Sequence, residues 1–211
     1  MDTICDKIIW RIIFSIFFLL ILAVSCKQPE RKSSWVEDYD SFYSSVTDSL
    51  TAYPQKVRGL TLQKMQMSTD SLEWYYYAAI VLKTYMFSSD VDSARHLRKK
   101  IEDFCDRQQP SPYIADLRSE YLNVKGNIYV RVGNMDSAII CFTDSYEQRL
   151  QGVKKELVSD ILINLADACS RQGKYDVSAY WYRKALQTSD SLGLSEEKRP
   201  PVYYGLAQVY M

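Results

Sequence analysis

Glycine and proline are scarce in this chain, with only 7 and 6 of them among 211 residues. Folds rich in β-turns place these two residues at their turns, so the shortage disfavours sandwiches and barrels. Tyrosine, by contrast, occurs 17 times, which suits long helices that pack through aromatic side chains. We therefore predict an all-α fold, the size of one ordinary domain or a short repeat array.

Neither sign of charge is in excess, because 26 lysines and arginines balance 26 aspartates and glutamates. A chain without a basic field cannot hold a phosphate backbone well. We therefore expect no nucleic-acid partner.

Histidine occurs once, as His96, among arginines and lysines that indicate a solvated helix face. A single histidine excludes any metal or catalytic site that needs two. A glycine-rich phosphate loop is missing as well. Four carboxylates fall at expected helix caps and exposed faces, namely Asp136, Asp144, Asp160 and Asp176. We predict a protein that is not an enzyme and that uses no metal and no cofactor.

An apolar segment lies near the N-terminus, where Ile12 to Ser25 carry no charge and follow Lys7 and Arg11. A helix of this length reaches roughly 21 Å, short of the roughly 30 Å hydrocarbon core, and so fits a signal peptide better than a spanning helix. If Arg11 snorkels, the apolar stretch extends back to Ile8 and could just cross a bilayer as an uncleaved anchor. In both cases the positive charge ahead of it places the following residues outside the cytoplasm.

The end of this segment, Leu22-Ala23-Val24-Ser25-Cys26, resembles the bacterial lipobox, in which small residues precede a cysteine that becomes the lipidated N-terminus. The resemblance implies cleavage after Ser25 and a diacylglyceryl group on Cys26, whose two acyl chains anchor stably in a membrane. Ala23 departs from the pattern, which prefers Leu, Val or Ile there, and ordinary cleavage without a lipid is the alternative. Residues 27–34 would form a polar tether. Because residues 27 and 28 are not acidic, we expect the periplasmic face of a bacterial membrane, with the outer membrane or cell surface as the alternative.

Cysteine adds little chemistry beyond this. Apart from Cys5 and Cys26, the chain has Cys105, Cys141 and Cys169, which lack the close spacing of a zinc site. Three cysteines allow at most one disulfide, and their apolar, helix-like contexts favour buried free thiols.

The chain contains an internal repeat. Residues 122–133 and 162–173 share their spacing of apolar, small and glycine positions, and the two segments are offset by 40 residues. The matching positions continue beyond the glycines and are Leu122 and Leu162, Gly126 and Ala166, Tyr129 and Cys169, Gly133 and Gly173, Ala138 and Ser178, and Phe142 and Tyr182. A third copy begins with Tyr203, Leu206, Ala207 and Tyr210.

This pattern resembles the tetratricopeptide repeat, in which two helices form a hairpin and hairpins stack into a solenoid. Gly133 and Gly173 lie where the first helix of a hairpin ends, a position suited to positive φ. Phe142 and Tyr182 are expected to fill the groove between neighbouring repeats. Small residues let the two helices approach closely, and these are Gly126, Ala138, Ala166, Ser178 and Ala207.

The chain departs from the family in its period, which exceeds the usual roughly 34 residues, and in lacking the proline between repeats. The extra residues must lengthen helices or connectors, so we predict one long helix from Lys154 to Arg171. Upstream, Val91 to Ala94 echoes Met135 to Ala138, which predicts an earlier hairpin at 71–87 and 92–105.

Two further amphipathic helices are predicted at 39–52 and 54–67, with Ser68 or Thr69 as caps. The predicted organisation is a signal segment at 1–25, a tether at 26–34, N-terminal helices at 35–70 and repeats at 71–211, the last of them incomplete, with about nine helices after residue 35.

The resemblance implies a scaffold that binds a peptide or protein partner on the concave surface of the solenoid, which first helices line. The residues expected to be exposed there are Asn123, Asn127, Arg131, Asn164 and Asp167. Aromatic runs at 74–77, 180–182 and 203–204 could also stack on sugars or peptides. Neighbours in a helix point in different directions, however, so we expect mainly helix packing from them.

Two other functions stay open. A lipoprotein-like leader followed by long tetratricopeptide repeats resembles the ectodomains of some bacterial sensor kinases, of which this chain would be an input region. The tyrosines and the lipobox also suggest a glycan-capture lipoprotein. A membrane-tethered interaction scaffold is our leading hypothesis.

Overall fold

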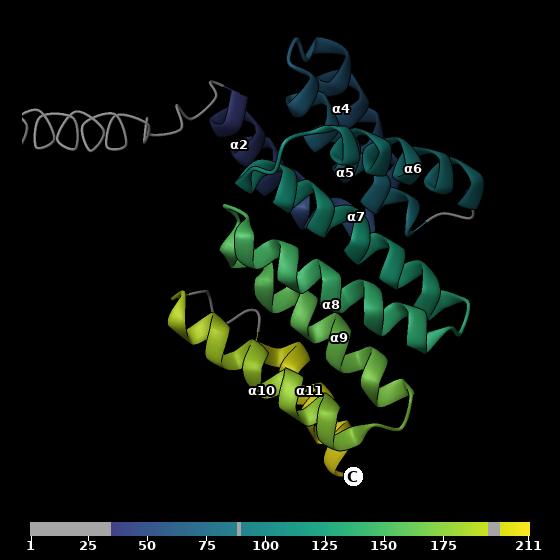
Figure 1. Ribbon diagram of the computed structural model, residues 1–211, viewed down its shortest axis with the longest axis vertical. Coiled ribbons are helices and arrows are strands. Elements are labelled where there is room, and N and C mark those ends of the chain that lie inside the picture. The colour runs from purple at the N-terminus through teal and green to yellow at the C-terminus, as the bar shows by residue number, and fades with distance from the viewer. Residues whose placement is uncertain (1–34, 88–89, 194–198) are drawn as a thin grey trace, which may run out of the picture. The chain divides into compact units, whose positions relative to one another are not determined.

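The tertiary structure, a computed structural model, describes residues 35–87, 90–193 and 199–211. Every regular element among these residues is a helix (Figure 1), which confirms the all-α prediction. The α-helices are α2 (Trp35–Thr47), α3 (Ser49–Ala52), α4 (Pro54–Met67), α5 (Ser71–Tyr85), α6 (Val91–Arg107), α7 (Pro112–Arg131), α8 (Met135–Gln151), α9 (Val158–Arg171), α10 (Tyr175–Ser191) and α11 (Arg199–Tyr210), and a 3₁₀ turn, η1 (Lys155–Leu157), precedes α9. The predicted signal segment and the whole tether, Cys26 included, lie outside the described residues.

Residues 39–211 form one compact unit built from helical hairpins. Helix α5 pairs with α6, α7 with α8, and α9 with α10, while α11 packs on α10 and α9. The first helices α5, α7, α9 and α11 also contact one another in series. The described second helices α6, α8 and α10 make no contact of similar extent with one another. The hairpins stack in chain order (Figure 1), as in a tetratricopeptide-like solenoid, whose first helices line the inner surface.

The helix boundaries correct several predictions. The region from Tyr39 to Ala52 is not one helix, because the chain breaks at Thr47-Asp48 into α2 and the single-turn α3. Ser68 caps the C-terminal end of α4, whereas the N-cap of α5 is Asp70, whose carboxylate accepts hydrogen bonds from the backbone N–H groups of Leu72 and Glu73. An Asp carboxylate at this position meets two N–H groups that have no partner inside the helix.

The turns inside the two matched hairpins are as predicted. Gly133 and Gly173 have φ values of 79° and 77°, in the left-handed region that residues with a Cβ enter at a cost. The residue after each glycine donates its N–H to a carbonyl of the last helical turn, from Asn134 to Tyr129 at 2.9 Å and from Lys174 to Cys169 at 3.0 Å. This Schellman-type closure ends the first helix and directs the chain into the second.

Small residues allow the close packing that the repeat pattern predicted. A Cβ added to Gly126 would lie 2.5 Å from the ring of Phe142, and Ala138, Ala166 and Ser178 are fully buried. Phe142 packs with Leu165, Ala168 and Cys169 of the next repeat, and Tyr129 lies against the same cluster. The prediction that Phe142 fills the groove between repeats is confirmed.

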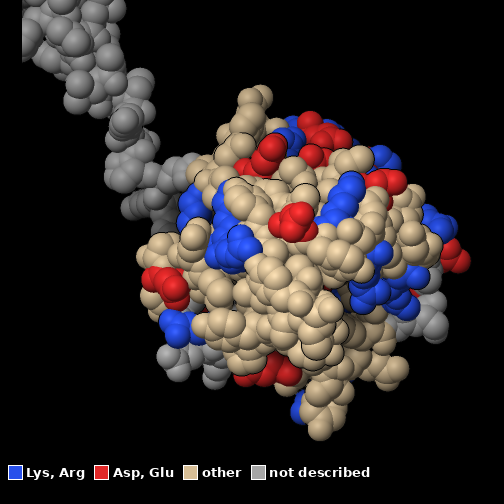
Figure 2. All heavy atoms as spheres, turned by 90° about the horizontal axis from the view of Figure 1, so that it is seen from below, with Lys and Arg blue, Asp and Glu red and all other residues tan. Residues whose placement is uncertain are grey.

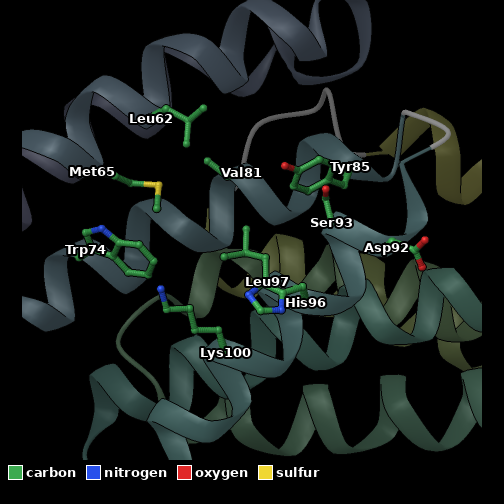
Figure 3. A pocket seen from close by; sticks show the side chains of 10 residues that line it. All are labelled: Leu62, Met65, Trp74, Val81, Tyr85, Asp92, Ser93, His96, Leu97 and Lys100. Carbon is green, nitrogen blue, oxygen red and sulfur yellow. The ribbon is translucent and has the colours of Figure 1, made fainter.

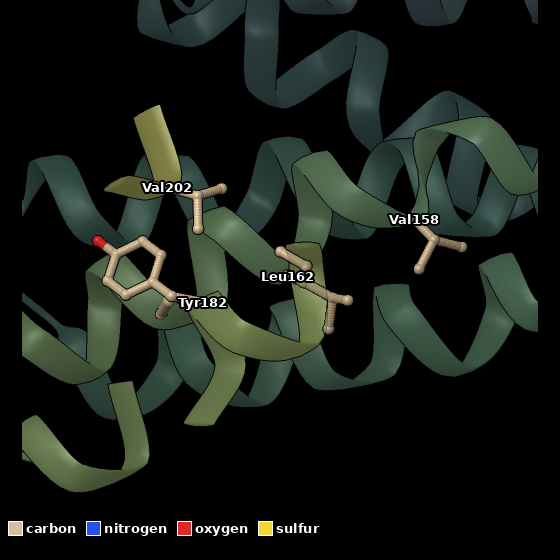
Figure 4. Close-up of a cluster of buried hydrophobic side chains, with 6 residues drawn as sticks. Val158, Leu162, Tyr182 and Val202 are labelled. Carbon is tan, nitrogen blue, oxygen red and sulfur yellow. The ribbon is translucent and has the colours of Figure 1, made fainter. Parts of the chain in front are cut away.

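Tyr182 fills the equivalent groove one repeat later. It lies in a buried cluster with Val158, Leu162 and Val202 (Figure 4). The prediction for Ala207 is wrong, since this residue is exposed on α11. Gly205 makes the close approach there, because its position would place a Cβ 2.1 Å from the Tyr182 ring.

The connector between the second and third hairpins contradicts the predicted helix from Lys154 to Arg171. The chain instead leaves α8 at Gly152, forms η1, and enters α9 at Val158. The reason is tertiary, because the carboxylate of Asp116 on α7 accepts hydrogen bonds from the backbone N–H groups of Val153 and Lys154 at 3.1 Å and 3.3 Å. These N–H groups therefore do not bond to carbonyls of α8, which ends before them. Part of the extra length of the 40-residue period lies in this connector.

Candidate functional site

Three of the predicted binding residues lie together on the inner surface. Asn164 on α9 donates from Nδ2 to Oδ1 of Asn123 on α7 at 3.0 Å. Asn127, one turn along α7, donates to the backbone carbonyl of Asn123 at 3.0 Å. All three are half-buried rather than exposed, because the asparagine pair bridges two neighbouring first helices. They form a polar seam between α7 and α9.

The other two predicted residues lie at the far ends of these helices. Arg131 is exposed, and its guanidinium donates to the carbonyl of Met86, just past α5, at 2.7 Å. Asp167 is exposed on α9 and accepts a hydrogen bond from the hydroxyl of buried Tyr182. Burial raises the pKa of the Tyr182 phenol, as does the adjacent Asp167 carboxylate, so Tyr182 stays a neutral donor. Asp167 is therefore a fixed carboxylate, whereas Arg131 is already engaged.

Asp167 borders a cleft of about 340 Å³ between α9 and α11. The cleft is lined by Ile163 and Pro201 and by polar groups of both helices, among them Ser170, Arg171, Tyr204 and Gln208. Arg171 is exposed, and no carboxylate of the described residues forms an ion pair with it. The amide of Gln208 donates to the hydroxyl of Tyr204 at 3.0 Å. The cleft thus presents an acceptor, a cation and an amide beside an apolar edge.

A buried charge cluster that the sequence did not reveal lies behind this surface. Arg149 on α8 donates to Asp116 at 2.8 Å and to Glu120 at 2.5 Å, both on α7. Lys83 on α5 pairs with the second oxygen of Glu120 at 2.7 Å. The side chains of Arg149 and Asp116 are each 1 % exposed. This cluster therefore connects three helices through charges that are largely withdrawn from solvent.

The ionisation of Glu120 depends on its cationic neighbours. Burial opposes ionisation, but the positive charges of Lys83 and Arg149 prevail and lower the pKa of Glu120 to about 2. Burial raises the pKa of Asp116, against the charge of Arg149. The close approach of Asp116 to the connector requires Gly152, where a Cβ would lie 1.9 Å from the carboxylate.

Little in the amino-acid pattern pointed to this cluster. Arg149 lies among polar residues of α8, and the repeat offset pairs it with Ser189, so no charge recurs there. Ser119 and Ser159 do recur at that offset. Each places its hydroxyl against a serine of the second helix in its own hairpin, Ser145 at 3.1 Å and Ser189 at 2.8 Å. A buried polar layer between paired helices could have been inferred from these serines.

The remaining candidates mostly follow the predictions. His96 is exposed on α6, as are Asp136, Asp144 and Asp176, whereas Asp160 is half-buried. Cys105, Cys141 and Cys169 are buried free thiols, and burial raises the pKa of Cys105 to about 12. Such thiols carry little thiolate at neutral pH and are poor nucleophiles.

The aromatic runs divide between core and surface. Tyr76 and Tyr77 are buried, and Tyr75 stacks on Phe104 with ring centroids 3.8 Å apart. Tyr203 and Tyr204 are exposed on α11, whose only charged residue is Arg199. Figure 2 views the end of the molecule where α10 and α11 lie, and uncharged side chains cover much of its centre.

No helix among residues 35–87, 90–193 and 199–211 combines the length and the apolar character needed to cross a bilayer. This result leaves the predicted signal segment untested, because that segment precedes the described residues.

Comparison with known proteins supports the repeat assignment. No curated protein and no solved structure matches the chain. Tetratricopeptide repeats are a non-catalytic fold that generally mediates protein–protein interaction. The model of the tetratricopeptide repeat family matches residues 117–191, from within α7 to the end of α10, so this part of the chain carries tetratricopeptide repeats.

Proposed function

We propose that the chain is a membrane-tethered scaffold that binds a peptide or protein partner along the inner surface of its solenoid. The observation that carries the proposal is the cleft between α9 and α11, which places Asp167, Arg171 and Gln208 around one opening. An extended peptide leaves backbone N–H and C=O groups that need partners. Carboxylate, guanidinium and amide side chains on rigid helices supply such partners.

The asparagine seam supports the same site. Asn123 and Asn164 bridge α7 and α9, so the spacing of these first helices is set before a partner arrives. A prearranged surface binds with a smaller ordering cost than a mobile one. We assign Asn123, Asn127 and Asn164 mainly to this positioning, and Asp167, Arg171 and Gln208 to contact with the partner. Arg131 extends the polar edge toward α5.

The tethering part of the proposal rests on the sequence around Cys26. A two-chain lipid on this cysteine would hold the solenoid at a membrane, because each buried CH₂ contributes about 0.8 kcal/mol. Residues 27–34 are rich in charged and small polar residues, and would act as a short polar spacer. We place the solenoid at the periplasmic face of a bacterial membrane.

The binding site is tested with the tagged full chain, recovered from solubilised membranes with its bound proteins. Arg171→Ala combined with Gln208→Ala should lose the partner, while Arg95→Ala, an exposed substitution on α6, should keep it. Thermal melting of each variant separates lost binding from lost folding. A partner retained at wild-type level by the folded double variant would contradict the proposed site.

Tethering is tested separately with Cys26→Ser. We expect incorporation of labelled palmitate in the wild-type chain, none in this variant, and release of the variant from the membrane fraction. Palmitate incorporation that persists in Cys26→Ser would overturn the assignment of the lipid to this residue. Because this readout does not involve the partner, the two parts of the proposal can fail independently.

A further inference from the structure

A second hollow lies away from the inner surface, between α4 and α6 and above α5. Its volume is about 520 Å³, within the range of ligand sites. The floor is apolar and includes Val81 of α5 and Met65 of α4, both buried. Figure 3 shows Leu62 on α4 facing Val81, with Leu97 of α6 on the opposite side. We call this hollow the α4–α6 groove.

The rim of the α4–α6 groove is polar and contains a cation without a carboxylate partner. The ammonium of Lys100 lies 4.6 Å from the centre of the Trp74 ring (Figure 3). The neighbouring Lys99 is paired with Asp103 at 2.7 Å, and Arg98 with Glu102 at 3.0 Å. No ion pair in the described part of the chain includes Lys100. An ammonium over an aromatic face keeps its attraction for an anion.

Cations predominate on α4 and on the first part of α6, the stretches that border the groove, although the whole of α6 carries five cations and four carboxylates and the chain is neutral. Helix α4 has Lys56, Arg58 and Lys64 and no carboxylate. The first ten residues of α6 contain one carboxylate, Asp92, and four cations, which are Arg95, Arg98, Lys99 and Lys100. Asp92, the one carboxylate in the lining, pairs with Arg95 at 3.1 Å. A partner with complementary charge is therefore acidic.

The form of that partner follows from what the lining offers. The groove is formed by side chains of three helices, whose backbone groups are paired within the helices. An extended peptide would leave its own backbone unpaired against this surface, whereas a helix satisfies its backbone internally. An apolar floor is also a poor site for a phosphate backbone, which needs cations along its whole length.

We propose that the α4–α6 groove binds an acidic amphipathic helix of a partner protein. Its apolar stripe would lie on Leu62, Met65 and Leu97, and a carboxylate would pair with Lys100. This site is separate from the α9–α11 cleft, so one solenoid would hold two partner segments at once.

Two neighbouring leucines provide a matched test. Leu62 lines the groove and is 42 % exposed, while Leu60 on the same helix is 41 % exposed and lies outside it. The substitutions Leu62→Asp and Leu60→Asp therefore each replace a leucine by an aspartate on α4 at similar exposure, and differ in whether the leucine lines the groove. Lys100→Glu and Lys99→Glu form the second pair and alter the net charge equally.

The probe is a fluorescein-labelled helical peptide of about 18 residues, five turns long, with a leucine stripe flanked by glutamates. Its binding to the full chain in zwitterionic lipid nanodiscs is measured by fluorescence anisotropy, with empty nanodiscs as the blank. We expect Leu62→Asp and Lys100→Glu each to weaken binding by about tenfold or more, since each removes one central contact. Leu60→Asp and Lys99→Glu should stay within about threefold of wild type, a difference of less than 1 kcal/mol.

Two control peptides complete the test. A peptide with lysines in place of glutamates and one with serines in place of the leucine stripe should both bind at least about tenfold more weakly. Equal binding of the lysine peptide, equal effects within either matched pair, or no binding of the acidic peptide would each overturn the proposal. Loss of binding in the Arg171→Ala and Gln208→Ala double variant would also overturn it, because that variant alters only the α9–α11 cleft.

Discussion

Arg149 and Asp116 form an ion pair at 2.8 Å with both side chains 1 % exposed. The pair joins α8 to α7, and through the hydrogen bonds of Asp116 it also holds the connector that leads to α9. One buried contact thus determines both the closure of the second hairpin and the path of the chain into the third.

Replacing Arg149 with Met should therefore destabilise the fold strongly. The change leaves Asp116 without its buried counter-charge and removes one of the two cations that pair with Glu120. Removing one partner of a buried ion pair typically costs about 3–5 kcal/mol. Urea unfolding measures the loss, and Arg95→Met on the exposed face of α6 is the control, expected to stay within about 0.5 kcal/mol of wild type. Equal stability of the two variants would show that the pair contributes nothing.

Acid should weaken the fold through Glu120. Its pKa is lowered from an ordinary 4.5 to about 2 in the folded state, so its contribution is complete above pH 4.5 and is lost as the pH falls to about 2. In Glu120→Gln, stability at neutral pH should be lower and its dependence on pH flatter in this window. Asp116, whose pKa is raised, changes the free energy of unfolding with pH in the opposite direction. It is present in both proteins. The measurement is the free energy of unfolding in urea from pH 6 to pH 2 for the wild type and for Glu120→Gln. Identical dependence on pH in the two proteins would refute the role of Glu120.

Alanine should have opposite effects at two helical glycines. At Gly126 a Cβ would meet the buried ring of Phe142 at 2.5 Å, and overpacking of this kind costs about 1–3 kcal/mol. At Gly59 on α4 no atom lies within 4 Å of the added Cβ, and alanine should stabilise by about 0.5–1 kcal/mol through its higher helix propensity. Thermal melts of Gly126→Ala and Gly59→Ala test the pair. Shifts of the same sign would contradict the packing argument.

The hairpin glycines should tolerate asparagine better than alanine. Gly133 and Gly173 have positive φ, which costs a residue with a Cβ about 1–2 kcal/mol, although asparagine enters this region more readily. We expect Gly133→Ala and Gly173→Ala each to destabilise by about 1 kcal/mol, and the Asn variants by less. Chemical unfolding of the four variants gives the ranking, and a preference for alanine at both turns would be inconsistent with it.

The repeat positions were predictable because local rules determine them. Gly133 and Gly173 end helices in any tertiary setting that allows a hairpin, and the spacing of Gly126, Phe142 and Tyr182 follows from helix periodicity. These residues lie in the structure where the pattern placed them. The prediction that Ala207 is a close-packed position was wrong, because the start of a third copy does not specify which small residue of α11 meets Tyr182.

The candidate site was only partly predictable. Helix periodicity placed Asn123, Asn164 and Asp167 on first helices, but it could not show that the two asparagines bond to each other. It also could not show that Asp167 borders a cleft with Gln208, which is 41 positions further along the chain. Contacts between helices depend on rotation and spacing, which are global properties of the packing.

The sequence by itself determined the helical class, the 40-residue repeat, the glycine turns and the close-packed positions, since each depends on backbone preference or on a short periodic pattern. The tertiary structure alone decided the break at Gly152, the charge cluster of Asp116, Glu120 and Arg149, and the two openings on the solenoid. The physical reason is that these features join residues from separate helices. Whether such a charge is buried and paired depends on the packing of those helices and not on its neighbours along the chain.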